Sequence, residues 1–400
     1  MGTVVTWGLS CLTMSAFTLL PANKAESTTL IMLGGALMFA VGALYLFFEK
    51  SILAETGSTD ELAEPGLDDK SRVILSIQLG LVLLSMIVTK SSIGYIQARQ
   101  GLPLGVLTVG RATLFVSFFV PQLHRLYPNS NYIHRLVVIF LQFAPTFIIL
   151  TISYEGLFYF AFCLCLFSWM RLEHQVYLHT TNGSKTGAAT AGSAKPPVEA
   201  AAPFVCADAE LEVSESSSLQ PYLDSRIEAI KNGGYRSLTL ADARIALFFF
   251  YFIQSAFFSA SNIASVSSFS LDAVYRLVPV FDPFSQGALL MVKLMVPFAF
   301  LSSVFGLLNM RLGVAPSALF MVVMAVSDVM TLSFFYMVKD EGSWLDIGTT
   351  ISHFVIASLL GVFVAGLELV SEVMIRGVEF GGKTIVRGNE TNGKVNGKTE

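Results

Sequence analysis

Ten apolar runs, each near the length that a helix needs to cross a lipid bilayer, recur along the 400 residues of this chain. A spanning helix takes ~20 mostly apolar residues, and irregular backbone is not tolerated against lipid. We therefore predict an all-α fold, a polytopic transmembrane helix bundle of about ten spans. Pro145 and the tight ISYEG turn make the boundaries of 104–121 and 135–171 the least defined. The expected spans are residues 4–20, 29–48, 73–90, 104–121, 135–152, 155–171, 243–260, 286–308, 316–337 and 348–370.

The composition agrees with a membrane protein. Hydrophobic residues make up 54% of the chain and charged residues only 14%, whereas soluble domains use ~45–50% apolar residues. A net charge of −4, without a basic patch interleaved with aromatic residues, argues against a nucleic-acid partner. None of the 4 cysteines forms a CxxC pair, so we expect buried thiols rather than a metal site or a disulfide framework.

Polar segments divide the predicted bundle. Residues 1–171 form its first part with about six spans, and 243–376 form its second part with about four spans. Between spans six and seven, 172–242 is a polar loop whose Ala/Gly/Pro-rich middle cannot bury a core, so we expect it to be largely disordered. Within this loop, SSLQPYLDSRIEAIKNGG has the pattern of a short amphipathic helix. The tail, 377–400, is polar and expected to be flexible.

The distribution of Lys and Arg predicts the orientation. An even number of spans places both termini on one side of the membrane. With cytosolic termini, most of the Lys and Arg residues near span ends lie in the cytosol, as the positive-inside rule favours. The loops around 262–285 and 339–346 then face the lumen.

Three ionisable residues of the late spans reach similar depth from the predicted lumenal face. At ~1.5 Å per residue, Asp328, Lys293 and His353 lie ~13, ~12 and ~8 Å below the lumenal ends of their spans. A charge left alone at mid-bilayer costs roughly 2.5 kcal/mol or more. We hypothesise that Lys293 pairs with Asp328, with His353 nearby, at the floor of a lumen-facing polar cavity. A purely structural ion pair, or Lys293 snorkelling toward the interface, explains the same residues.

Small and hydroxyl residues crowd the segment AFFSASNIASVSSFS, 256–270. This pattern predicts either a broken or re-entrant piece that lines a cavity, or a plain interfacial loop. Asp272 and Arg276 follow it on the predicted lumenal side. Arg111, inside an apolar run, is expected either to pair with a neighbour such as Glu155 or to mark a span that is not simple.

A charged turn joins the last two expected spans within residues 327–354. Asp340 and Trp344 either contact lipid headgroups there or only end two helices, with Trp344 as an interface anchor. No G-x-S-x-G, P-loop or HExxH motif occurs, and His124 and His134 have no third ligand in view. We predict no catalytic or metal-binding residue; the candidate substrate-binding residues are Asp272, Arg276, Lys293, Asp328, Asp340, Trp344 and His353.

The stretch DVMTLSFFYMVKDEGSWLDIGTTISHF, 328–354, resembles the C-terminal membrane region of the phosphatidylinositol-glycan class N family, the GPI ethanolamine phosphate transferases 1. Residues 123–173 (LHRLYPNSNYIHRLVVIFLQFAPTFIILTISYEGLFYFAFCLCLFSWMRLE) and 256–298 resemble the same family. The resemblance implies an endoplasmic reticulum enzyme that moves ethanolamine phosphate from phosphatidylethanolamine to the first mannose of a GPI precursor. In that family the chemistry belongs to a lumenal, alkaline-phosphatase-like domain with zinc and a Thr nucleophile.

That lumenal domain has no counterpart in the present sequence, so no catalytic residue is carried over and no cofactor is expected in this chain. We expect a C-terminal fragment, an incomplete gene product, or a membrane part whose catalytic domain is supplied separately. Its expected partners are membrane lipids, namely phosphatidylethanolamine and the GPI precursor, and the lumenal catalytic domain. Its expected function is to hold the lipid substrates for that domain. The alternatives are a transporter or scramblase of lipids or small solutes, and a scaffold that packs against other membrane subunits.

Overall fold

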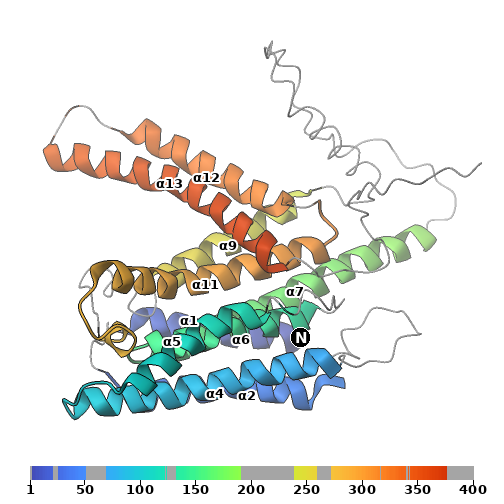
Figure 1. The fold of residues 1–400 in the computed structure, drawn as a ribbon. Coiled ribbons are helices and arrows are strands. Elements are labelled where there is room, and N and C mark those ends of the chain that lie inside the picture. Colours follow the sequence, from blue (N-terminus) through green and yellow to red (C-terminus); the bar gives the residue numbers. More distant parts are fainter. Residues whose placement is uncertain are drawn as a thin grey trace, which may run out of the picture.

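The computed structural model describes residues 2–20, 26–50, 69–121, 123, 132–190, 238–258, 272–315, 317–338, 341 and 343–375. These ranges contain long helices and no β-strand (Figure 1). The prediction of an all-α membrane helix bundle is confirmed.

Each of the ten expected spans corresponds to one long helix of the described residues. The bounds are α1 Gly2–Leu19, α2 Thr28–Phe47, α4 Asp69–Gln97, α5 Leu104–Phe119, α6 Tyr132–Leu150, α7 Glu155–Thr190, α9 Leu240–Phe258, α11 Pro283–Arg311, α12 Ala318–Met337 and α13 Trp344–Ile375, with the 3-10 helix η2, Val274–Arg276, before α11.

The chain is a multi-pass membrane protein. Within the described ranges, 7 helices are long and apolar enough to cross a membrane, namely α2, α4, α6, α7 as far as Val176, α11, α12 and α13. The apolar helices at Gly2–Phe17 and Leu104–Phe119 are shorter than this criterion. Length and composition therefore define most of the predicted spans directly.

The centre of the bundle is α6. In the 18-residue apolar stretch of this helix, 94% of the residues are buried inside the protein. The helix packs against α2, α4, α5, α7 and α11. Tyr159 of α7 stacks on Phe140 and Phe147 of α6, with ring centroids 5.5 and 4.8 Å apart. Pro145 lies inside α6. Proline is tolerated within a spanning helix because neighbouring helices help to satisfy the backbone polar groups that it leaves without a hydrogen bond. The helix α6, which lies in the region where the sequence left the span boundaries least defined, thus forms the core of the bundle.

The helices α12 and α13 form a hairpin that diverges from the other helices (Figure 1). In the 18-residue apolar stretches of α12 and α13, only 28% and 22% of the residues are buried. The contacts of α13 with α11 include Phe298 against Phe363 and a hydrogen bond from Ser302 Oγ to the Leu367 carbonyl. At the same crossing, a Cβ added to Gly306 would lie 3.0 Å from Ile375 Cδ1. Small residues permit such close approach of two helices.

The helix ends meet at two opposite edges of the bundle. The first edge carries the residues before α2, the turn between α6 and α7, and η2, and there the Ser27 N–H donates to the Ile152 carbonyl. The second edge carries the end of α2, the starts of α4 and α6, and the end of α13, where Arg135 Nε donates to the Met374 carbonyl at 2.8 Å. The first edge carries the helix ends that adjoin the loops expected to be lumenal, and the second carries those that adjoin the loops expected to be cytosolic.

Several helices extend beyond the predicted spans, and the largest difference is at the end of α7. α7 runs to Thr190 rather than ending at 171, so the polar region begins as helix. Once a helix has formed, each further residue adds a hydrogen bond, and polar residues extend it beyond the apolar span. The rest of the expected loop to 237, the segment 259–271 and the tail from 376 lie outside the described residues.

Substituting Gly306 tests the crossing between α11 and α13. We expect Gly306→Leu to lower the free energy of unfolding by about 1–3 kcal/mol, because the added side chain overpacks a close contact. Thermal unfolding in detergent measures this. Gly287→Leu is the matched control, since nothing lies within 4 Å of a Cβ at Gly287 of the same helix. Equal losses in both variants would contradict the packing at this crossing.

Candidate functional site

The candidate site lies at the first edge, around the turn between α6 and α7. Glu155 is the first residue of α7, and its side chain is only 3% exposed. Its Oε2 accepts hydrogen bonds from Thr151 Oγ1 at 3.2 Å and from the Ile152 N–H at 3.1 Å. A carboxylate at a helix start also interacts favourably with the helix dipole. The local sequence therefore fixes the carboxylate before any distant partner is added.

Lys293 of α11 is the distant partner of Glu155. Its Nζ lies 2.8 Å from Oε2 and 2.9 Å from Oε1 of that carboxylate, and its side chain is 4% exposed. Desolvating two charges is expensive, so removal of one member of such a pair costs roughly 3–5 kcal/mol. The pair therefore holds the start of α7 against α11. The contact point on α11 is Lys293, ten positions after the first residue of that helix.

Arg276 forms a second ionic contact next to this pair. Its Nη1 donates to the carbonyls of Ile149 and Thr151 at 2.7 and 2.8 Å, and its Nη2 forms an ion pair with Glu26. The side chain is fully buried. Burial lowers the pKa of the Arg276 guanidinium, and the neighbouring Glu26 carboxylate opposes this shift. The guanidinium stays charged, as arginine does in proteins.

Further hydrogen bonds tie neighbouring backbone to the same edge. Arg111 Nε of α5 donates to the Leu277 carbonyl at 2.9 Å, and Gln286 Nε2 of α11 donates to the Val278 carbonyl at 3.1 Å. Asp282 caps α11 by accepting from the Phe284 N–H. The contacts of this edge thus join α2, α5, α6, α7, η2 and α11, and we call the set Glu26, Thr151, Glu155, Arg276 and Lys293 the ion-pair site.

The predicted pairing of Lys293 with Asp328 is wrong. Lys293 pairs with Glu155, while Asp328 is exposed on α12. His353 is exposed on α13 and packs against the Phe334 ring, with centroids 5.5 Å apart. Depth along a helix follows from the sequence, but lateral position does not, and the α12–α13 hairpin diverges from the helices that hold Lys293.

Arg111 also has a different partner from the one that the sequence suggested. It binds a backbone carbonyl of the segment after η2, not Glu155. Among the other candidates, Asp272 is exposed just before η2, and Trp344 at the start of α13 is 89% exposed. Asp340 lies outside the described residues.

The expected buried thiols are partly borne out. Cys163 and Cys165 are buried and free, and Cys11 is free and half-buried. Cys206 lies outside the described residues. Across the described ranges, no group of three His, Cys, Asp or Glu residues is arranged to hold a metal ion.

Three members of the ion-pair site, Thr151 and the carboxylates Glu26 and Glu155, were not predicted in their roles. Glu155 was noted only as a possible partner of Arg111, and Glu26 was not singled out. Both carboxylates are close to ends of apolar runs, at 26 and 155, and this position is the sequence signal that marks them. Neither distance along the chain nor hydropathy identifies the cation with which Glu26 or Glu155 forms an ion pair.

The chemistry of the ion-pair site is that of a structural clamp. Lys293 and Glu155 neutralise each other, and the Nη atoms of Arg276 are held by two carbonyls and a carboxylate. Within the described part of the chain, Arg276 Nε and Ser153 Oγ are buried without a hydrogen-bond partner. Buried polar atoms of that kind usually bind water or another polar group.

A multi-pass helical membrane protein with a charged clamp at one edge is the class that these observations define. The chain belongs to the phosphatidylinositolglycan class N (PIG-N) family, whose model matches residues 1–343. No solved structure matches it.

Several curated relatives carry the name GPI ethanolamine phosphate transferase 1. Those of Aspergillus oryzae and Aspergillus fumigatus are 55% identical over 369 and 370 residues, 92% of this chain and 34% of each relative. That of Emericella nidulans is 55% identical over 356 residues, 89% of this chain and 36% of the relative. The chain thus spans about a third of the length of these relatives.

Reversing the charges tests the observed pair against the predicted one. We expect Lys293→Glu and Glu155→Lys each to reduce the folded yield in detergent strongly, because a buried charge loses its partner at a cost of roughly 3–5 kcal/mol. The double variant Glu155→Lys/Lys293→Glu should recover part of that yield. Fluorescence-detected size-exclusion chromatography measures the monodisperse fraction.

The matched control is the double variant Lys293→Asp/Asp328→Lys, which exchanges the charges of the pair that the sequence suggested. It should be no better folded than Lys293→Asp alone. Recovery in this control but not in the Glu155–Lys293 exchange would contradict the structure.

Proposed function

We propose that this chain is the membrane portion of a GPI ethanolamine phosphate transferase that acts on the first mannose of GPI-anchor precursors in the endoplasmic reticulum. It holds the lipid substrates for a lumenal catalytic domain outside these 400 residues. The observation that carries the proposal is 55% identity, along 92% of the chain, to proteins named GPI ethanolamine phosphate transferase 1.

The first edge is the part of the bundle suited to this work. In the proposed orientation it faces the lumen, where the headgroups of both lipid substrates react. The ion-pair site fixes the ends of several helices there, so that the rim keeps its shape while substrates exchange. Because their charges are neutralised by protein groups, Arg276 and Lys293 act as positioning residues rather than as direct ligands of a headgroup.

Exposed residues near the same edge are the proposed lipid contacts. Asp272 precedes η2, and Trp344 begins α13. An indole at the interface is suited to the headgroup region, and a carboxylate attracts an ammonium group such as that of ethanolamine. Asp328 and His353 lie deeper on the exposed hairpin, where they would meet lipid that enters beside it. Asp340 adjoins Trp344 in sequence and is proposed for the same role.

The partners follow from the same proposal. They are phosphatidylethanolamine, the GPI precursor and the lumenal catalytic domain, and the zinc that the family resemblance implies belongs to that domain. No group suited to bind zinc occurs among the described residues. The chain itself contributes lipid binding and the geometry of the rim.

Transport or scrambling is the less favoured alternative. A polar path across a bundle requires ionisable groups that exchange partners as the cargo passes. Here the buried cation Lys293 contacts both oxygens of one carboxylate, and Arg276 is fully buried among backbone carbonyls. These contacts favour a fixed bundle that presents lipids at one edge.

Complementation tests the proposed function. The corresponding third of a full-length fungal relative is replaced by this chain, and the chimera is expressed in cells that lack their own enzyme. We expect the chimera to restore modification of the GPI precursor, measured by mass spectrometry of accumulated glycolipids. Trp344→Ala and Asp272→Ala should lower the modified fraction several-fold at unchanged protein abundance, because both remove contacts at the rim.

Phe119→Ala is the matched control for Trp344→Ala. Phe119 is also an exposed aromatic at a helix end, 70% exposed, but it ends α5 at the second edge. Its substitution should leave the modified fraction unchanged. A folded chimera with no activity, or equal losses in all three variants, would contradict the proposal.

A further inference from the structure

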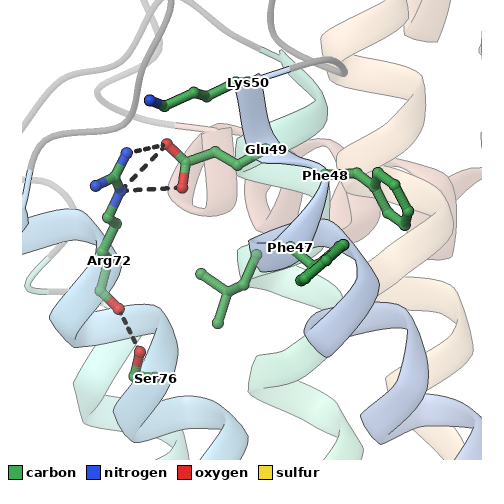
Figure 2. A pocket seen from close by; sticks show the side chains of 7 residues that line it. Phe47, Phe48, Glu49, Lys50, Arg72 and Ser76 are labelled. Carbon is green, nitrogen blue, oxygen red and sulfur yellow. Dashed lines mark hydrogen bonds and ion pairs between the residues drawn. The ribbon is translucent and has the colours of Figure 1, made fainter.

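A pocket at the second edge remains outside the proposed function. It has a volume of about 410 Å³ and is lined by Leu46, Phe47, Phe48, Glu49, Lys50, Arg72 and Ser76. These residues come from the end of α2 and the start of α4 (Figure 2). Since both helices are membrane spans, their ends place the pocket where hydrocarbon gives way to headgroups.

The polar wall of the pocket is a fixed guanidinium. Arg72 Nε and Nη2 donate to the Glu49 carboxylate at distances of 2.9–3.2 Å, as Figure 2 shows. The Glu49 side chain is 5% exposed, whereas that of Arg72 is 40% exposed. The buried carboxylate binds one edge of the guanidinium, and this orients Arg72 in the pocket wall. A pre-oriented cation binds an anion with less loss of side-chain freedom.

Arg72 Nη1 and Lys50 supply the donors for an anion. Nη1 lies 3.7 Å from Asp69 Oδ1, and the Asp69 side chain is 97% exposed, so this contact is weak. Lys50 is exposed and lines the same pocket (Figure 2). Lys70 is exposed at the same helix start but does not line the pocket. Guanidinium and ammonium groups together are the usual protein ligands of phosphate.

The other wall of the pocket is apolar. Phe47 and Phe48 are 82% and 49% exposed, and their rings meet edge to face with centroids 5.0 Å apart. Aromatic rings at this depth contact the glycerol and upper acyl region of a lipid. The pocket thus presents cations beside an exposed apolar surface, which matches a phosphate attached to a hydrocarbon chain rather than a free anion.

We infer that this pocket binds the phosphate of an anionic phospholipid from the leaflet at the second edge. Arg72 Nη1 and Lys50 Nζ bind the phosphate oxygens, and the first part of an acyl chain lies against Phe47. The inference is independent of the proposed function, since the site lies at the opposite edge from the ion-pair site and takes no part in ethanolamine phosphate transfer.

Native mass spectrometry of the purified 400-residue chain in detergent tests the inference. Dioleoyl phosphatidylserine and dioleoyl phosphatidylcholine are added at equal concentrations, and the bound lipids are counted. We expect preferential binding of phosphatidylserine, and about fivefold weaker binding by Lys50→Gln, the change expected for one cation near an anionic headgroup. Phe47→Ala should also weaken binding of phosphatidylserine.

Lys70→Gln is the matched control, because Lys70 is exposed at the same edge but does not line the pocket. Its affinity for phosphatidylserine should equal that of the unsubstituted chain. Equal losses in both lysine variants, or in neither, would overturn the inference in favour of diffuse charge attraction. Full displacement of phosphatidylserine by an equal concentration of inorganic phosphate would overturn the lipid assignment. No preference over phosphatidylcholine would also overturn it.

Discussion

The buried ion pair between Glu155 and Lys293 is the contact on which the arrangement of the first edge depends. Neither charge is tolerated alone in hydrocarbon, so α7 and α11 must pack together wherever the chain is inserted. The turn that follows α6 holds the carboxylate through its own hydroxyl and N–H groups, which fixes the point where the lysine must arrive. Arg276 then binds the carbonyl of Ile149 near the end of α6 and that of Thr151 in the same turn.

This clamp separates the bundle into a fixed part and an exposed part. The fixed part surrounds α6, whose 18-residue apolar stretch is 94% buried, and includes the helices that contribute to the ion-pair site. The exposed part is the α12–α13 hairpin, whose 18-residue apolar stretches are only 28% and 22% buried. Two of the exposed ionisable residues, Asp328 and His353, lie on this hairpin. A rigid rim beside two exposed helices is an arrangement suited to lipids that enter from the side and present their headgroups at one face.

The helices were predictable because hydropathy over a bilayer length is a local property of the sequence. All ten expected spans appear as helices, even where Pro145 made the boundaries uncertain. The end of α7 was not predicted, because hydropathy marks where a span leaves the membrane and not where its helix stops.

The ion-pair site was only half predictable. Lys293 was identified from the high energetic cost of a lone cation in an apolar run. Its partner was not, because the rise per residue gives depth but no information on which helices are neighbours. Asp328 lies at a similar depth on a helix that diverges from the core, whereas Glu155 lies at a helix start that an aromatic-rich packing brings against α11. The partner of a buried charge is thus a property of tertiary packing.

The orientation of the two edges is the central claim, and thiol labelling in sealed microsomes measures it most directly. In a chain with its native cysteines replaced, single cysteines are introduced by Trp344→Cys at the first edge and by Lys50→Cys at the second. A membrane-impermeant maleimide added outside should label the position of Lys50 at once and that of Trp344 only after detergent opens the vesicles. Immediate labelling at Trp344 with protection at Lys50 would contradict the account, because the clamped rim would then face the cytosol.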